Sequence, residues 1–262
     1  MLDSFVKQLK NDGELIEIDN FVNPDLQITE IADRYSKQPN GGKALLFNNN
    51  GTDFPLLINA FGSENRICKA LGISNVDEFS NRISSIFTSF QTKPKGLVGK
   101  LKIIPQLISF RKFIPRKIKG RGACQAIINK HPNLNQLPIL TCWPFDGGRF
   151  ITLPIVHTVD PDTGIRNVGM YRMQQFSETE TGMHWHKHKV GARHYEAYKS
   201  KGLRMPVSVV LGGDPVYTYA ATAPVPDNFD EYVLAGFIRN RPVKLVKCIT
   251  NDLFVPEDAD IV

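Results

Sequence analysis

Residues 167–188 read NVGMYRMQQFSETETGMHWHKH, and this stretch decides how the rest of the chain is interpreted. Its residues favour strands, and turn residues precede it and recur at 177–182. The sequence therefore predicts a hairpin or meander whose adjacent strands carry Asn167, Arg172 and His188. Side chains of these types can bind a metal, a phosphate or a carboxylate, although the polar face of an ordinary sheet would give the same pattern.

The composition is that of a globular protein with a core of its own. The chain has 262 residues, 42% of them hydrophobic and 10% aromatic, which allows one large domain or two small ones. No apolar run reaches the roughly 18 residues of a membrane-spanning helix, and the mixed amino-terminal residues do not form a signal-peptide pattern. Four scattered cysteines without a CxxC pair indicate reduced thiols in a cytosolic protein.

Positive charge is concentrated in one part of the chain. The formal net charge is +6, from 32 Lys and Arg against 26 Asp and Glu. Residues 79–145 contain 12 of the basic residues and no acidic one, which leaves 20 bases against 26 acids, or −6, elsewhere. Within this part, residues 91–122 interleave basic residues with Leu, Ile, Phe and Pro. We predict a basic connector over 91–122.

The connector has three open interpretations. It is a linker with a solvated basic face, or it makes peripheral contact with an anionic membrane, as short basic amphipathic segments do. Nucleic-acid binding is the third, and we do not expect it because no recognised motif accompanies the charge.

Periodicity predicts an α+β protein whose secondary-structure content differs before and after the connector. Residues 1–90 read as an N-terminal α/β domain, and residues 123–262 read as a β-rich domain. In the first, helices are expected at 2–11, 24–36, 63–71 and 75–90, with strands at 14–18, 44–47 and 56–60. In the second, strands are expected at 126–128, 150–159, 166–176, 206–211 and 243–249, with helices ending near 201 and spanning 230–239.

Two different metal sites are compatible with the residues. His184, His186 and His188 alternate, so on a strand they would share one face, as a three-histidine zinc site or as an exposed polar face. A better chemical match is Asn167, one histidine and a carboxylate, with Glu231 as a candidate. Such a set suits Mn²⁺ or Mg²⁺ with open positions for phosphate oxygens.

Arg172 is the candidate for holding a carboxylate, because a guanidinium fork binds one bidentately; a surface ion pair is the alternative. Other nucleotide and hydrolase motifs are excluded. The Gly212-Gly213-Asp214-Pro215 turn lacks the Lys-Ser/Thr of a Walker A loop, and neither GxGxxG nor GxSxG occurs.

Five stretches follow one another along the chain: NVGMYR (167–172), WHKH (185–188), LGGDP (211–215), PVP (224–226) followed by EY and AG (231–236), and VKCITNDL with VP (246–256). Together they resemble the UbiD-type decarboxylases, whose best-known bacterial members are the 3-polyprenyl-4-hydroxybenzoate decarboxylases of ubiquinone synthesis. Their combined order and spacing cover nearly the whole chain.

The resemblance implies an N-terminal α/β domain followed by a flavin-binding split β-barrel. It also implies prenylated FMN with a divalent metal, usually manganese, plus potassium. The expected activity is reversible decarboxylation of an aromatic or α,β-unsaturated acid, and the full-length form is expected to be a homo-oligomer. The family's glutamate-rich acid/base segment and C-terminal domain would follow Val262, so this chain is expected to be truncated and inactive alone.

The resemblance also assigns roles by position. Asn167, His188 and Glu231 would hold the metal that bridges the cofactor phosphate, and Arg172 would orient the substrate carboxylate. The residues expected to bind the flavin cofactor are Asn167, Met170, Tyr171, Arg172, His184, Trp185, His186, Lys189 and Val190.

One segment departs from the family pattern. Residues 184–191 read HWHKHKVG where bacterial relatives usually read RWLSHRGG, which keeps the metal histidine and replaces two arginines with groups that lack a guanidinium fork. The alternative function is therefore a non-catalytic flavin- or metal-binding module, or a subunit completed by another chain.

Overall fold

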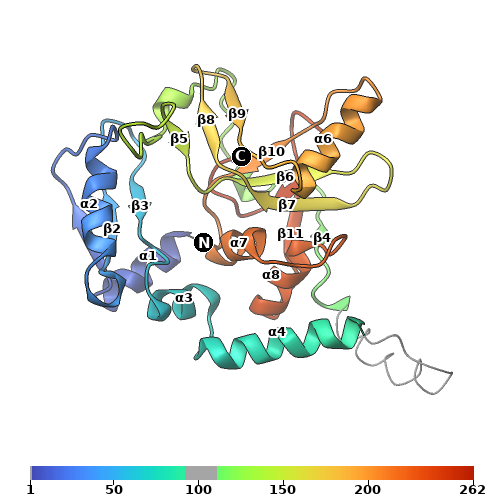
Figure 1. The fold of residues 1–262 in the computed structure, drawn as a ribbon, viewed down its shortest axis with the longest axis horizontal. Coiled ribbons are helices and arrows are strands. Elements are labelled where there is room, and N and C mark those ends of the chain that lie inside the picture. The colour runs from blue at the N-terminus through green and yellow to red at the C-terminus, as the bar shows by residue number, and fades with distance from the viewer. Residues whose placement is uncertain (1, 92–110) are drawn as a thin grey trace.

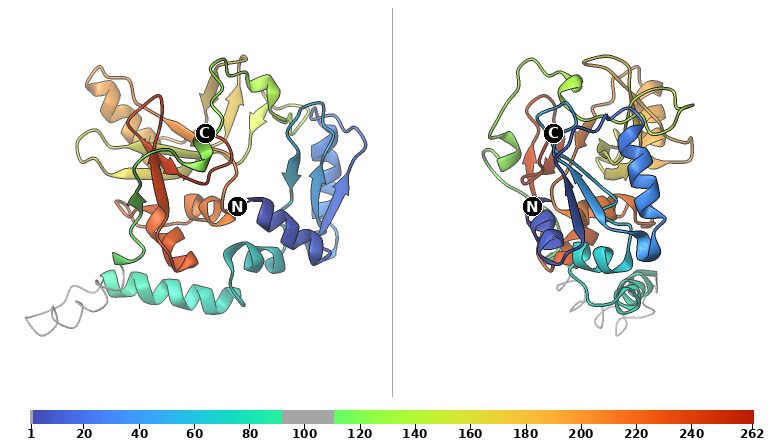
Figure 2. Two further views of the ribbon diagram at one scale, coloured as in Figure 1. Left: turned by 180° about the vertical axis from the view of Figure 1, so that it is seen from behind. Right: turned by 90° about the vertical axis from the view of Figure 1, so that its left-hand side faces the viewer.

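The computed structural model describes residues 2–91 and 111–262. A small α/β unit and a larger β-rich unit lie side by side (Figure 1). The long helix α4 (Val76–Gln91) lies below the larger unit, as both the front view and the view from behind show (Figure 1, Figure 2). The sequence predicted an α+β protein, and the mixture of helices and strands is confirmed. Most of the predicted connector falls on residues 92–110, which lie outside the described residues.

The N-terminal unit is a three-stranded sheet with helices on both faces. Strand order is β1-β2-β3, with β1 parallel to β2 and β3 antiparallel to it. Leu45 and Phe47 of β2 pack towards α2, whereas Ala44 faces α1 and α3, as the two-residue period of a strand requires. The remaining elements are α1 (Leu2–Asn11), β1 (Leu15–Ile18), α2 (Gln27–Ser36), η1 (Pro39–Gly41), β2 (Ala44–Phe47), β3 (Leu56–Ile58) and α3 (Glu64–Leu71).

Capping residues set the ends of these helices. Ser63 Oγ accepts a hydrogen bond from the Arg66 amide at 3.2 Å, and Asn75 Oδ1 accepts one from the Asp77 amide at 2.6 Å. Both helix starts agree with the predictions. The predicted start of α2 at residue 24 is wrong, because Leu26 has a φ of 67° and the helix begins at Gln27.

The larger unit contains three separate three-stranded sheets. Their orders are β10-β6-β7, β12-β11-β4 and β5-β8-β9, and the described strands do not close into a barrel. The elements are β4 (Arg116–Lys117), η2 (Ala123–Gln125), η3 (Leu134–Gln136), β5 (Phe150–Ile151), β6 (Ile155–Val159), β7 (Arg166–Met170), β8 (Met173–Gln175), β9 (Thr181–Met183), α6 (Val190–Ser200), β10 (Ser208–Val210), α7 (Pro215–Thr222), α8 (Glu231–Arg239), β11 (Lys244–Lys247) and β12 (Phe254–Pro256).

Three strand predictions need correction. Residues 126–128 are not a strand, because they follow the 3-10 turn η2 and Ile127 is 91% exposed. The stretch 150–159 divides into β5 and β6, and the stretch 166–176 divides into β7 and β8. The break between β7 and β8 lies at Tyr171 and Arg172, which belong to neither strand.

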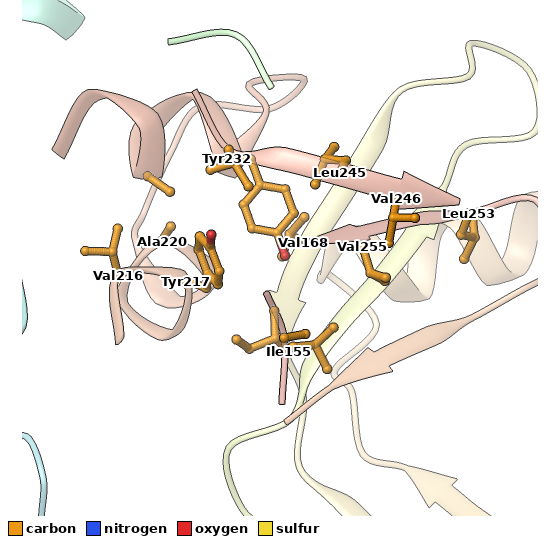
Figure 3. Packing of buried hydrophobic residues seen from close by; sticks show 14 of the residues in the cluster. Ile155, Val168, Val216, Tyr217, Ala220, Tyr232, Leu245, Val246, Leu253 and Val255 are labelled. Carbon is orange, nitrogen blue, oxygen red and sulfur yellow. The ribbon is translucent and has the colours of Figure 1, made fainter. Parts of the chain in front are cut away.

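The main core lies between the sheets and the helices α7 and α8. Ile155 and Val168 from the β6–β7 sheet and Leu245 from β11 pack there with Tyr217 and Tyr232 (Figure 3). Each such aliphatic side chain contributes roughly 1.5–3 kcal/mol when buried. Tyr232 lies one residue after Glu231, so this packing fixes the first turn of α8.

Arg239 at the end of α8 ties the two units together. Its guanidinium donates to the Ala70 carbonyl of α3 at 2.7 Å and to the carboxylate of Asp214, which caps α7. Asp214 is only 1% exposed, so removing Arg239 would leave a buried carboxylate without its partner and destabilise the fold. Across the described residues, no helix is both long enough and apolar enough to cross a membrane.

Candidate functional site

The site begins at Asn167, a buried amide at the second residue of β7. Its side chain is 5% exposed, and Nδ2 donates to Thr158 Oγ1 at 3.4 Å and to the Tyr171 hydroxyl at 3.3 Å. Thr158 lies directly opposite Asn167 in the β6–β7 register. The polar group is therefore buried with its hydrogens satisfied, as burial of an amide requires.

Tyr171 folds back over the site because two glycines leave room for its ring. A Cβ at Gly169 would lie 2.5 Å from the tyrosine ring, and one at Gly191 would lie 3.0 Å from it. The Tyr171 hydroxyl accepts a hydrogen bond from the Gly191 amide at 3.2 Å. This hydroxyl therefore joins β7 to the first turn of α6, and a side chain at either glycine would force the ring out.

Glu231 meets β7 beside Asn167. It is the first residue of α8 and only 8% exposed, and its Oε2 accepts from the Val168 amide at 3.0 Å. Burial raises the pKa of Glu231 to about 7. The Glu231 carboxylate therefore binds the β7 backbone one residue after Asn167, and these two buried side chains are the pair from which the site is built.

Next to this pair, Arg166 and Asp230 form an ion pair between β7 and the N-cap of α8. Asp230 also accepts from the Tyr232 amide at 2.9 Å. The ion pair and the cap fix the start of α8 against β7 independently of Glu231.

His188 lies on an exposed turn instead of a strand. Strand β9 ends at Met183, so the prediction that three alternating histidines share a strand face is wrong. His186 and His188 stack with ring centroids 5.6 Å apart. Over residues 2–91 and 111–262, no three His, Cys, Asp or Glu side chains are grouped to hold a metal.

The turn that carries His188 leads directly into α6. Lys189 is the N-cap of this helix and its side chain makes no cap bond, and Val190 is the first helical residue. Gly191 follows and reaches the Tyr171 hydroxyl. The amino end of α6 is therefore anchored three residues after His188, next to the buried pair.

Arg172 is held in an ion pair. Its guanidinium donates to both carboxylate oxygens of Asp146, one of them at 3.0 Å, and lies 3.5 Å from the centre of the Phe150 ring. The pair raises the pKa of Arg172 and lowers the pKa of Asp146. Substrate binding by this fork would therefore require Asp146 to give way.

The other expected cofactor residues surround these groups. His184 packs edge-on against Phe150, and its Nε2 donates to Gln174 Oε1 at 3.2 Å. Trp185 packs edge-on against Tyr171 with centroids 5.8 Å apart. Met170 is half-buried at the end of β7, and His186 is exposed.

Four residues beside the candidate site were missed from the sequence. Asp146 and Phe150 contact Arg172, Thr158 contacts Asn167, and His194 Nδ1 lies 2.9 Å from Thr158 Oγ1. Thr158 had a usable signal. The turn at 160–165 pairs residue 159 with 166, and hence 158 with 167. The other three depend on contacts between distant segments.

Comparison with protein families identifies the class of the chain. The model described as "3-octaprenyl-4-hydroxybenzoate carboxy-lyase Rift-related domain" matches residues 116–262, and the corresponding N-terminal domain matches residues 6–83. The first match alone covers more than half of the chain, and the chain belongs to the UbiD family. The family resemblance drawn from the sequence is confirmed.

Among similar sequences are uncharacterized proteins of Aquifex aeolicus, 44% identical over 261 residues, and of Archaeoglobus fulgidus, 43% identical over 263 residues. The matches cover 99% and 100% of this chain and 53% of each relative. The chain spans about half the length of these relatives.

Solved structures share the fold. HmfF from Pelotomaculum thermopropionicum, in complex with FMN, superposes with a TM-score of 0.76 at 23% identity, over 98% of this chain and 53% of that one. The vanillic acid decarboxylase of Sedimentibacter hydroxybenzoicus, in its closed form, gives 0.80 at 24% identity, over 98% and 52%.

Proposed function

We propose that this chain supplies the flavin- and metal-binding part of an enzyme that reversibly decarboxylates an aromatic or α,β-unsaturated acid. Membership of the UbiD family supports the proposal. So do proteins of the same fold, one bound to FMN, one to prFMN, and others described as decarboxylases of vanillic and 3,4-dihydroxybenzoic acids. The observation that carries it is that Tyr171 links the buried Asn167 amide to the amino end of α6, while the buried Glu231 carboxylate binds the backbone amide of the next residue, Val168.

The metal part of the proposal assigns Mn²⁺, or Mg²⁺, to Asn167, Glu231 and His188. Carboxylate and amide oxygens with one imidazole suit these ions and leave positions for phosphate oxygens. The raised pKa of Glu231 fits this assignment, because a cation beside the buried carboxylate would favour its ionised form. Potassium is included by resemblance only.

The cofactor part places the phosphate of prenylated FMN at the amino end of α6. Amides there and the positive end of the helix dipole attract a phosphate. When bound, the cofactor would supply the electron sink for decarboxylation. The residues proposed to line it are Asn167, Met170, Tyr171, Arg172, His184, Trp185, His186, Lys189 and Val190.

Arg172 would orient the substrate carboxylate by exchanging Asp146 for it. Both are carboxylates that a guanidinium fork binds bidentately, so the exchange conserves the number of hydrogen bonds. Phe150 would keep the guanidinium plane in place during the exchange.

The wider organisation is also inferred. We assign residues 1–90 to an N-terminal domain, 91–122 to a connector and 123–262 to a split β-barrel domain, and we expect the full-length protein to be a homo-oligomer. A dimeric form exists for the evolved HmfF of Pelotomaculum thermopropionicum.

Cofactor uptake tests the proposal. The purified chain is incubated with prenylated FMN, with and without Mn²⁺, and then examined by absorbance spectroscopy and native mass spectrometry. We expect flavin retention that depends on Mn²⁺ and that is lost in Tyr171→Ala, with Tyr198→Ala on α6 as a matched control. Failure to retain flavin under both conditions would contradict the proposal.

A further inference from the structure

Behind Asn167 runs a chain of buried hydrogen-bonding groups that the proposed reaction does not use. Thr158 Oγ1 lies 2.9 Å from His194 Nδ1, and His194 Nε2 lies 4.0 Å from Asp160 Oδ2. Thr158 is completely buried and His194 is 5% exposed. The chain thus leads from the site-facing amide to a carboxylate at the β6–β7 turn.

The order of donors along this chain can be worked out. Asn167 Nδ2 has hydrogens and no lone pair to offer, so it donates to Thr158 Oγ1. The hydrogen of the buried Thr158 hydroxyl then needs an acceptor of its own, and His194 Nδ1, 2.9 Å away, is the nitrogen that can accept it when it carries no proton. The imidazole proton is on Nε2, where the Asp160 carboxylate favours it.

The second amide hydrogen of Asn167 is accounted for as well. It is donated to the Tyr171 hydroxyl oxygen, which also accepts from the Gly191 amide. With both hydrogens directed at Thr158 and Tyr171, the amide oxygen of Asn167 points away from these partners and remains available as an acceptor. The reversed amide would need the opposite pattern, with the histidine proton on Nδ1.

We propose that Thr158 and His194 are positioning residues that set the orientation of the Asn167 amide and so present its oxygen to the metal. The inference rests on the proposed function for the metal, but the hydrogen-bond order can be tested without any metal. Groups that orient a ligand typically change metal affinity by about 10- to 100-fold when removed.

The first experiment reads the tautomer directly. Nitrogen-15 NMR of the metal-free chain, with His194 assigned through a His194→Gln variant, reports which ring nitrogen carries the proton. We expect the proton on Nε2 in the wild type. A proton on Nδ1 would mean that His194 donates to Thr158, and it would overturn the inference whether or not the protein binds flavin.

The second experiment measures Mn²⁺ affinity by calorimetry in the presence of FMN. Thr158→Val removes the hydroxyl with little change in volume and should weaken Mn²⁺ binding about tenfold or more, whereas Thr158→Ser should restore it. Thr179→Val, in an exposed turn, is the matched control. Thermal unfolding of each variant separates lost orientation from lost folding.

The outcomes separate the two proposals. If the wild-type protein takes up no Mn²⁺ in the presence of FMN, the metal assignment is contradicted. The tautomer of His194 then remains the test of the hydrogen-bond order from Asn167 through Thr158 to His194. A wild type that binds, together with a Thr158→Val variant that binds equally well, contradicts the positioning role while leaving the metal assignment intact.

Discussion

The two sides of the candidate site are built in opposite ways. On one side Asn167, Thr158 and Glu231 are at most 8% exposed and hydrogen-bonded within the sheet and α8. On the other, His186 and His188 lie on an exposed turn. The buried side chains are held by hydrogen bonds before any ligand arrives, whereas the exposed side chains of the turn lose rotamer freedom when they bind.

The largest expected effect concerns His157, which supports the buried side from β6. It is fully buried, with Nε2 2.6 Å from the Tyr232 hydroxyl and Nδ1 3.2 Å from the Ser208 carbonyl. Burial lowers the pKa of His157 from 6.5 to about 3. Below about pH 6.5 the His157 side chain becomes protonated in the unfolded chain but stays neutral in the folded chain. The free energy of unfolding therefore decreases as the pH falls from 6.5 towards 3. The loss is roughly 5 kcal/mol at about 1.4 kcal/mol per pH unit.

Urea unfolding at a series of pH values measures this loss. The steep dependence between pH 6.5 and 3 should flatten in His157→Gln and persist in the exposed His131→Gln control. Equal slopes in the wild type and His157→Gln would mean that His157 takes up protons in the folded state.

Second in size is the removal of the buried carboxylate. Glu231→Ala should weaken Mn²⁺ binding in the presence of FMN by about 30-fold or more, the equivalent of at least ~2 kcal/mol for loss of a buried charged partner. Glu231→Gln keeps the shape and the acceptor for the Val168 amide, so it separates charge from packing. Calorimetry that shows unchanged affinity in both variants would remove Glu231 from the metal site.

The same carboxylate gives a pH signature of opposite sign to His157. Its folded-state pKa is raised from 4.5 to about 7, so its contribution to stability is present below pH 4.5 and is lost as the pH rises through 7. Mn²⁺ must displace the proton, and its affinity should therefore rise about tenfold per pH unit up to about pH 7 and then level off. A flat affinity profile over this range would contradict the raised pKa.

Third, the exposed turn can be tested without disturbing the fold. His188→Ala should weaken Mn²⁺ binding about tenfold and change the stability of the metal-free chain by less than ~0.5 kcal/mol, because the residue is exposed. His186→Ala removes its stacked neighbour and is the matched control. Equal losses of affinity in both variants would show that stacking of the two rings, and not ligation by His188, explains the effect.

How far the sequence could predict the molecule follows the same division. Local signals predicted α1, the caps at Ser63 and Asn75, and the β8–β9 hairpin, because periodicity and turn residues act over a few positions. Glu231 was selected as a candidate ligand only through family resemblance, since 63 residues separate it from the Val168 amide it binds. The partner of Arg172 was missed for the same reason, because Asp146 lies 26 residues away.

The smallest expected effect tests whether Asp146 competes for Arg172. Asp146→Asn removes one charge from a partly exposed pair, so it should change stability by at most ~1 kcal/mol. Freed from that competitor, the guanidinium should bind benzoate up to about fivefold more tightly in the presence of FMN and Mn²⁺, as the same ~1 kcal/mol converts to affinity.

Asp227→Asn is the matched control, because Asp227 also binds an arginine, Arg193, through both carboxylate oxygens but lies on an exposed surface. It should leave benzoate binding unchanged. Weaker benzoate binding in Asp146→Asn would reverse the assignment: Asp146 would then aim the guanidinium at the substrate, in the way that Thr158 is proposed to aim the amide of Asn167. In that case Arg172, like Asn167, would be positioned by the protein before the ligand binds. The turn that carries His186 and His188 would then be the part of the site that differs from the rest.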